Sequence, residues 1–164
     1  MPNLDFDMPQ NQSSAIKVIG IGGGGSNAVN YMYHKGIKGV DFVVCNTDQQ
    51  ALDDSPVPTK IQLGVSLTEG LGAGAWPVRG RMAAEENIND VIEVLECNTK
   101  MVFLNAGMGG GTGTGAAPVI AKAAKDLDIL TVAIVTIPFV FEGELRMSQA
   151  KEGIEEIKKY VDSL

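Results

Sequence analysis

Two glycine-rich segments constrain this 164-residue sequence more than any other feature, because each lies between an apolar run and a stretch with helical spacing. The first spans residues 22–25 and follows the apolar run 16–21. The second spans residues 109–115 and follows the apolar run 101–104. Glycine lets a ligand approach the backbone closely, and the N–H groups at a helix start bind anions. Each segment is therefore predicted to be an anion-binding loop between a strand and a helix.

The alternative is that these glycines only make tight turns. That interpretation stays open for residues 22–25 taken alone. It fits residues 109–115 poorly, because seven loop residues, five of them glycine, would cost conformational entropy without a structural gain. Two such loops at one sheet edge favour a phosphate site.

Strand-like and helix-like stretches alternate along the chain. Strands are predicted at residues 16–21, 40–45, 60–63, 101–104 and 130–137; helices are predicted from Ser26 or Asn27 to Gly36, at 79–96, at 116–127 with Pro118 in the first turn, and at 144–160. This alternation predicts an α/β fold with a mostly parallel sheet and helices on both faces. Ligands of such sheets bind beyond the carboxyl ends of the strands, where both glycine loops are expected.

The glycine patterns distinguish between kinds of phosphate loop. Neither loop contains a lysine, so the G-x-x-x-x-G-K-[ST] pattern of P-loop NTPases is absent. The first loop satisfies G-x-G-x-x-G through Gly20, Gly22 and Gly25, and Asp48 follows the second strand. A dinucleotide-binding Rossmann domain is therefore a competing interpretation. It leaves the second loop unexplained.

The second loop carries a specific motif, because residues 110–115 read Gly-Gly-Thr-Gly-Thr-Gly and match the tubulin signature G-G-T-G-[ST]-G. Other segments that agree in order and spacing are Gly22-Gly23-Gly24-Gly25-Ser26-Asn27, Asn46-Thr47-Asp48, Leu71-Gly72-Ala73-Gly74-Ala75, Ala106-Gly107-Met108, Ala116-Ala117-Pro118 and Pro138-Phe139-x-Phe141-Glu142-Gly143 with Arg146. From about Ile16 to Leu164 the sequence resembles the tubulin/FtsZ family, and within it the bacterial cell-division branch. The resemblance implies a Rossmann-like GTPase domain.

The resemblance also implies a site for GTP or GDP, with Mg²⁺ arriving on the phosphates. The glycine loops would line the phosphates, the loop around Ala73 would sense the third phosphate, and Glu142 and Arg146 would approach the ribose. The implied binding residues are Gly22, Gly23, Gly24, Gly25, Ser26, Asn27, Ala73, Gly74, Gly109, Gly110, Gly111, Thr112, Gly113, Glu142 and Arg146. From spacing alone, Glu142 and Arg146 could instead form only a helix-surface pair.

The sequence departs from the family pattern after residue 75. The family commonly has Asn-Pro there and then an acidic residue, whereas this chain has Trp76-Pro77 and then Val78-Arg79. The single tryptophan is thus a core anchor, an interface anchor or a sign of an altered site. Asp48 is left open between a place near the metal or a neighbouring subunit and a simple strand end.

Composition excludes several classes of function. A formal net charge of −7 argues against nucleic-acid binding, which selects clustered Lys and Arg. The two cysteines, Cys45 and Cys97, fit buried or incidental free thiols in a reducing cytoplasm. No stretch fits a signal peptide or the roughly 20 apolar residues of a membrane span, so no membrane insertion is expected. The lone His34 gives no support for a metal site.

The expected organisation is a flexible polar tail at residues 1–14 and a GTP-binding domain at residues 15–164. The sequence stops as a further strand is expected at 160–164, so a longer protein is anticipated. In the family that it resembles, the absent C-terminal domain carries the catalytic loop that completes the neighbour's site. The resemblance then implies head-to-tail filaments of the division ring in the cytoplasm at mid-cell, with regulators and membrane tethers binding absent regions. We expect this chain alone to contain no catalytic residue and to be nearly inactive.

Two other classes of function stay open. An NAD-dependent oxidoreductase domain would bind its cofactor through the first glycine loop and be indifferent to Thr112. A capping module would add to a filament end without completing a site.

Overall fold

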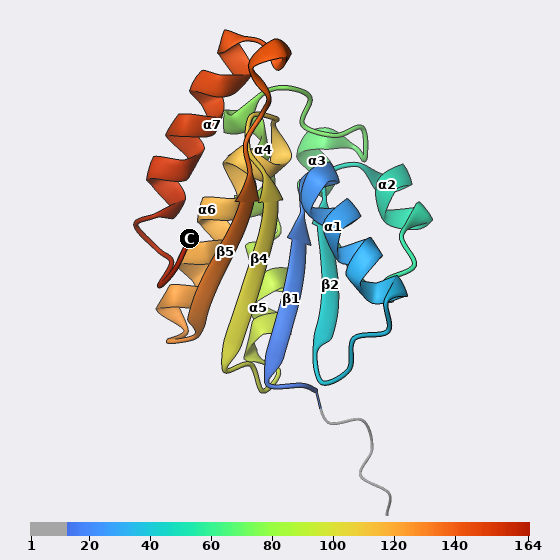
Figure 1. Cartoon of the computed structure of the whole chain (residues 1–164). Helices are drawn as coiled ribbons and strands as arrows, with labels where there is room; N and C mark the ends of the chain where they lie inside the picture. Colours follow the sequence, from blue (N-terminus) through green and yellow to red (C-terminus); the bar gives the residue numbers. More distant parts are fainter. Residues whose placement is uncertain (1–12) are drawn as a thin grey trace, which may run out of the picture.

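The computed structural model describes residues 13–164, and they form a five-stranded parallel sheet covered by helices on both faces (Figure 1). The strands are β1 (Ile16–Ile21), β2 (Asp41–Asn46), β3 (Thr59–Gln62), β4 (Met101–Gly107) and β5 (Leu130–Thr136). Their order is β3-β2-β1-β4-β5. The α/β fold expected from the sequence is confirmed, and the sheet order reverses at β1, so the space beyond its carboxyl end is the expected ligand crevice.

The helices are α1 (Gly22–His34), α2 (Gln49–Asp54), α3 (Val65–Thr68), α4 (Pro77–Glu86), α5 (Ile88–Glu96), α6 (Thr112–Asp126) and α7 (Glu144–Ile157), with a 3₁₀ turn η1 (Val140–Glu142). Within the described residues, no helix is long and apolar enough to cross a membrane.

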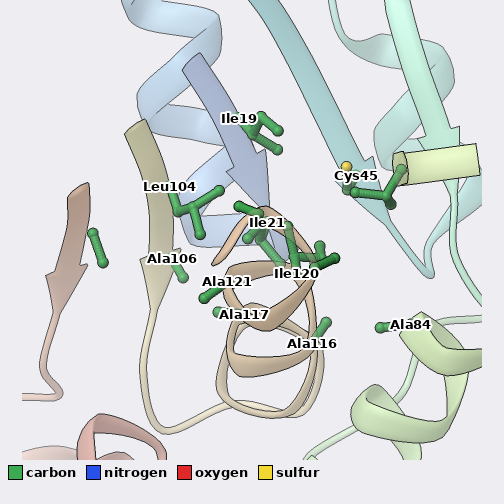
Figure 2. Packing of buried hydrophobic residues seen from close by; sticks show 14 of the residues in the cluster. Ile19, Ile21, Cys45, Ala84, Leu104, Ala106, Ala116, Ala117, Ile120 and Ala121 are labelled. Carbon is green, nitrogen blue, oxygen red and sulfur yellow. The ribbon is translucent and has the colours of Figure 1, made fainter. Parts of the chain in front are cut away.

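Alternate residues of β1 face two separate cores, as the period of a strand requires. Val18 packs with Val29 of α1 in the smaller core. Ile19 and Ile21 pack in the larger core, against the small residues and Ile120 of α6 (Figure 2). The larger core also includes buried residues of α4, α5 and α7. Helices α1 and α6 therefore pack on opposite faces of the sheet, and the carboxyl edge of the sheet lies between them.

Three predicted helix boundaries were wrong. Helix α1 begins at Gly22 with Ile21 as N-cap and no side-chain cap, so neither Ser26 nor Asn27 starts it. Helix α6 begins at Thr112, which places Pro118 inside the helix and half of the second glycine segment in its first turn. The predicted helix 79–96 breaks at Asn87 into α4 and α5. In the first two cases close packing holds glycine in a helix that its propensity disfavours.

Glycine is required where α1 and α6 meet the rest of the fold. A side chain at Gly25 would overlap the carbonyl oxygen of Asn105, and one at Gly115 would overlap that of Pro77. These contacts bring α1 against β4 and α4 against α6 at backbone distance. The glycines of the two loops are therefore needed for packing, whether or not they also contact a ligand.

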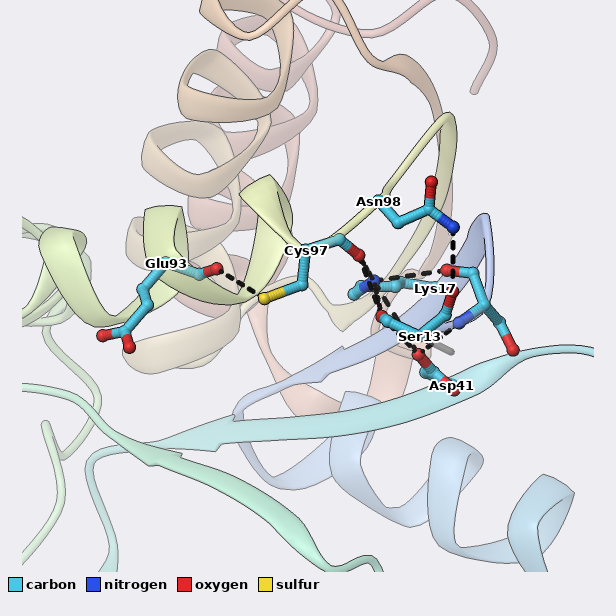
Figure 3. A network of polar contacts seen from close by, with 7 residues as sticks. Ser13, Lys17, Asp41, Glu93, Cys97 and Asn98 are labelled. Atoms are coloured by element: carbon cyan, nitrogen blue, oxygen red, sulfur yellow. Dashed lines mark hydrogen bonds and ion pairs between the residues drawn. The ribbon is translucent and has the colours of Figure 1, made fainter. Parts of the chain in front are cut away.

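The expected further strand at residues 160–164 is present only as one parallel bridge between Ser163 and Val132. At the other end, the predicted flexibility of residues 1–12 lies outside the described residues. Ser13 and Ser14 are held by the domain. Asp41 accepts a hydrogen bond from the Ser14 N–H at 2.9 Å, and the buried Lys17 donates to Ser13 Oγ at 2.9 Å and to the Cys97 carbonyl at 2.7 Å (Figure 3).

Both cysteines are free thiols, as expected: Cys45 is buried and Cys97 is exposed. Burial raises the pKa of the Cys45 thiol to about 12, which rules it out as a nucleophile near neutral pH.

Candidate nucleotide-phosphate site

A cavity of about 540 Å³ lies beyond the carboxyl end of the sheet. Both glycine segments reach it, the first through Gly23 and Gly24 and the second through residues 110–113. Its remaining walls come from the ends of β2 and β5, the loop before α4, and the start of α7. The other lining residues are Ile21, Asn46, Thr47, Asp48, Ala51, Leu71, Gly72, Ala73, Gly74, Gly107, Met108, Thr136, Ile137, Pro138, Glu142 and Arg146.

The starts of α1 and α6 touch one another at the base of the cavity. Gly22 has φ +72°, a backbone conformation that residues with a side chain rarely adopt. A Cβ at Gly22 would lie 2.9 Å from the Gly113 nitrogen. A side chain at Gly113 would overlap the Gly107 carbonyl oxygen. Because the first N–H groups of a helix have no partner within the helix, two sets of free donors and two positive helix ends converge on one space.

Two threonine hydroxyls fix the second loop. Thr112 Oγ1 lies 2.7 Å from Thr47 Oγ1 in a buried contact that ties α6 to the end of β2. Thr114 Oγ1 accepts a hydrogen bond from the Gly109 N–H at 2.8 Å. The alternating threonines therefore stabilise the conformation of the loop through their hydroxyl groups.

The segment from residue 69 to 76 forms the third wall. The Gly72 N–H donates to the Thr47 carbonyl at 3.2 Å, and Leu71 forms an antiparallel bridge with Asp48. Gln149 of α7 donates from Nε2 to the Ala75 carbonyl at 3.3 Å. These contacts set Ala73 and Gly74 against the second glycine loop, where a side chain at Gly111 would overlap the Gly74 carbonyl oxygen.

Glu142 at the end of η1 and Arg146 in the first turn of α7 line the cavity and form an ion pair of 3.2 Å. Glu142 also accepts a hydrogen bond from the Phe139 N–H at 3.0 Å. The ion pair that the spacing allowed is present, but it joins η1 to α7 and does not lie on one helix, and the same two residues line the cavity. A carboxylate and a guanidinium in this place are suited to sugar hydroxyls and phosphate.

Five of the residues implied by resemblance do not line the cavity. They are Gly22, Gly25, Ser26, Asn27 and Gly109. Gly22 and Gly25 pack behind the loops, Ser26 is buried with its hydroxyl unpartnered, and Asn27 is exposed. Gly109 faces Pro138 and the Arg146 carbonyl. Their direct contact with a ligand stays a prediction.

Sequence reasoning assigned no binding role to several residues of the cavity wall, chiefly Asn46, Thr47 and Thr136. Asn46 and Thr47 belonged to a segment that agrees with the family pattern, and their position at the carboxyl end of β2 was the usable signal. Asp48 has two functions in the structure, because its carboxylate caps α2 by accepting from the Ala51 N–H at 3.1 Å and also lines the cavity.

Trp76 is 70% exposed, so its interpretation as a core anchor was wrong. It is the N-cap of α4 and adjoins the wall formed by Ala73 and Gly74. Around the cavity, Leu71, Phe139 and Phe141 are likewise exposed. No group of three or more His, Cys, Asp or Glu side chains arranged to hold a metal exists among residues 13–164.

Two helix starts with glycine first turns face one cavity at the switch point of a parallel sheet, an arrangement that suits phosphate binding in an α/β domain. The sequence model of the Tubulin/FtsZ family, GTPase domain, matches residues 15–164. This chain therefore belongs to the tubulin/FtsZ family, as the sequence motifs indicated.

The chain is similar to "Cell division protein FtsZ" of Porphyromonas gingivalis, with 59% identity over 150 residues that make up 91% of this chain and 33% of the relative. It is 60% identical over 153 residues to the protein of the same description from Coxiella burnetii, covering 93% of this chain and 39% of the relative. The chain thus spans between a third and two fifths of the length of these curated relatives.

Among solved structures, "FtsZ dimer, empty (M. jannaschii)" matches with a TM-score of 0.88 and 44% identity over 93% of this chain and 44% of that chain. "CetZ2 from Haloferax volcanii - GTPgS bound protofilament" matches with a TM-score of 0.81 and 27% identity over 90% of this chain and 47% of that chain. Both likenesses support the fold, and the first also supports the FtsZ branch.

Proposed function

We propose that this chain is the nucleotide-binding part of a GTPase that polymerises head to tail in the bacterial division ring. One observation carries the proposal: both glycine segments line the same cavity. A nucleoside triphosphate has several phosphates that each need neutralising donors, and two converging helix starts supply them without lysine. The protofilament described for the Haloferax relative and the dimer described for the M. jannaschii relative support self-assembly.

In this proposal each wall has a separate task. The N–H groups of residues 110–113 and of Gly23 and Gly24 hold the phosphates. Gly74 and Ala73 contact the third phosphate, so their loop distinguishes GTP from GDP. Glu142 accepts hydrogen bonds from ribose hydroxyls, and Arg146 offsets phosphate charge.

Magnesium fits the same site because its lining offers hard oxygen ligands, among them the Asp48 carboxylate. When bound with the nucleotide, the ion would neutralise charge on the phosphate oxygens. The residues of this chain supply orientation, which phosphoryl transfer requires more than covalent chemistry.

We further propose that the groups that position the attacking water come from a neighbouring subunit, outside this chain. The chain covers two fifths or less of the P. gingivalis and C. burnetii relatives, which leaves room for the domain that would carry those groups. In the cell the full-length protein would work at mid-cell, with regulators and membrane tethers binding its other parts. The purified chain would bind nucleotide weakly and turn over almost none.

A single-turnover assay with radiolabelled GTP tests this division of labour. We expect the 164-residue chain to bind GTP and to release phosphate at the rate of a no-enzyme control. A full-length relative, such as the C. burnetii protein, serves as the positive control. Turnover by the chain alone at the full-length rate would overturn the proposal, provided that a Gly110→Ala variant purified in parallel lacks it.

A dinucleotide-binding oxidoreductase is the competing function. It rests on Gly20, Gly22 and Gly25, and of these only Gly22 is placed in contact with the second loop. None of the three lines the cavity, whereas four residues of the second loop do. Binding of NAD that survives a change at Thr112 would favour this alternative.

A further inference from the structure

A second cavity of about 650 Å³ lies away from the nucleotide edge, across α4, α5, α6 and α7. Its apolar residues include Ile88, Ile92, Pro118, Val119 and Leu127. We call this cavity the α6 groove. These helices cover one face of the sheet, and α1 covers the other (Figure 1). The α6 groove is within the size range of specific binding pockets.

The charged residues along the α6 groove are predominantly acidic. Its two basic side chains are already paired within their own helices, Arg81 with Glu85 at 3.1 Å and Lys122 with Asp126 at 3.1 Å. That leaves one acidic residue of α7 in excess. It is Glu152, which forms no ion pair within residues 13–164, whereas Lys159 contacts Glu156 at 2.6 Å.

The α6 groove also contains an unsatisfied acceptor. Gln149 donates its Nε2 to the Ala75 carbonyl, but its Oε1 is buried and has no partner within the described residues. A buried acceptor without a donor costs about 1–3 kcal/mol of stability. The apolar lining and the unpaired Glu152 suit an apolar occupant that carries positive charge.

The end of α1 and the turn after it present these features on the opposite face. Tyr31 is 63% exposed, and Lys35 lies over its ring with Nζ 5.0 Å from the ring centroid. Ile37 and Lys38 are exposed beside them. In a chain of net charge −7, residues 22–40 contain no Asp or Glu. We call Tyr31, Lys35, Ile37 and Lys38 the α1 patch.

The acidic end of α2 does not cover the α1 patch. Its contact with α1 is the 2.6 Å hydrogen bond between Ser55 Oγ and Asn30 Oδ1, which precedes the patch. The α1 patch is thus an exposed, basic and apolar surface. It complements the acidic and apolar surface of the α6 groove in charge and in character.

We propose that a second copy of this chain docks its α1 patch in the α6 groove. The two lysines supply the positive charge that the groove lacks, and Tyr31 and Ile37 supply apolar surface. Because the two surfaces lie on opposite faces of the sheet, the contact is heterologous and leaves one of each free for the next copy. The contact joins the α1 face of one copy to the α6 face of the next and lies away from the nucleotide cavity. It would place chains side by side independently of bound nucleotide.

Sedimentation velocity of the nucleotide-free 164-residue chain tests the contact. In low salt we expect concentration-dependent association that is lost at about 0.5 M salt, since exposed charges are screened there. Lys35→Glu with Lys38→Glu is expected to weaken association about tenfold or more, and so is Glu152→Lys with Glu156→Lys, because both create like-charge contacts. The quadruple variant restores opposite charges and should return to within about threefold of the parent.

Lys60→Glu with Lys100→Glu is the matched control, because it makes the same charge change at exposed residues outside both surfaces. Its association should equal that of the parent. Changing Glu156 removes its ion pair with Lys159, whereas Glu152 forms no ion pair among the described residues. Glu152→Lys alone is therefore a groove variant that breaks no ion pair there. Circular dichroism checks that each variant is folded.

Three results would overturn the proposal. The parent could remain monomeric at every concentration in low salt, the groove and patch variants could associate as the control does, or the quadruple variant could stay dissociated while folded. A monomeric chain whose groove binds an added basic amphipathic peptide in a Glu152-dependent manner would also overturn it, and would assign the groove to another protein.

Discussion

Gly110→Ala separates ligand contact from packing at the proposed phosphate site. Gly110 lines the cavity, its φ is not positive, and a Cβ built on it meets no protein atom within 4 Å. The fold should therefore accept the methyl group, with a gain of up to about 1 kcal/mol from a less flexible unfolded chain. Phosphates against this loop would meet the methyl group directly.

The expected loss of binding follows from the cost of overpacking. An added methyl in a filled site costs about 1–3 kcal/mol, which corresponds to roughly 5- to 150-fold weaker nucleotide binding. Isothermal titration calorimetry with GTP measures the affinity, and urea unfolding measures stability. Gly23→Ala has the same open surroundings and lines the same cavity, so it should behave alike.

Gly113→Ala is the contrasting variant. A Cβ there would overlap the Gly107 carbonyl oxygen, so the change should lower the free energy of unfolding by about 1–3 kcal/mol. Unchanged GTP affinity in a folded Gly110→Ala variant would refute the claim that this loop holds the phosphates. Equal destabilisation by Gly110→Ala and Gly113→Ala would refute the packing argument.

Three further predictions concern other contacts. Thr112→Val should cost about 1–3 kcal/mol of unfolding free energy, because it leaves the buried Thr47 hydroxyl without its partner; Thr112→Ser should retain stability. Burial acts to raise the pKa of Asp41, but hydrogen bonds from Ser13 and Ser14 and the charge of Lys17 outweigh it and lower that pKa below 3.8. Its stabilising effect is therefore present at neutral pH and is lost as the pH falls through the lowered value, so Asp41→Asn should be less stable at pH 7 and converge with the parent in acid-unfolding curves. A thiol reagent should label the exposed Cys97 in the native chain and reach Cys45 only after unfolding, which mass spectrometry can verify; equal labelling rates would contradict the burial of Cys45.

The strands could be predicted from sequence because each includes apolar residues that the fold buries, and β1 and β2 consist almost entirely of buried residues; the order of the strands in the sheet was not predicted. The sheet edge that carries the site followed from the same pattern. The starts of α1 and α6 could not be predicted, because Gly22 and Thr112 start helices through contacts with distant backbone, whereas the predicted start of α7 at Glu144 was confirmed. Local rules place glycine in loops, and only the packing of α1 and α6 against β4 reverses that preference.

The candidate site was predictable where the ligand-facing atoms belong to the backbone of a glycine segment. For Asn27 the resemblance implies contact with the ligand, and the structure leaves this residue exposed outside the cavity lining, so its contact stays a prediction. The orientation of a helical residue depends on where its helix begins, and that was the boundary that sequence reasoning misjudged. Trp76 shows the same limit, because nothing in its neighbours Ala75 and Pro77 distinguishes a core side chain from a surface one.

The central claim is that both glycine loops hold the phosphates of a single guanine nucleotide. The most direct test is equilibrium binding of GTP, GDP, ATP and NAD in the presence of magnesium, followed through the fluorescence of Trp76. We expect GTP and GDP to bind, ATP and NAD not to bind, and Gly23→Ala and Gly110→Ala each to weaken the binding of GTP. Binding of NAD, or binding of GTP that depends on one loop and is indifferent to the other, would contradict it.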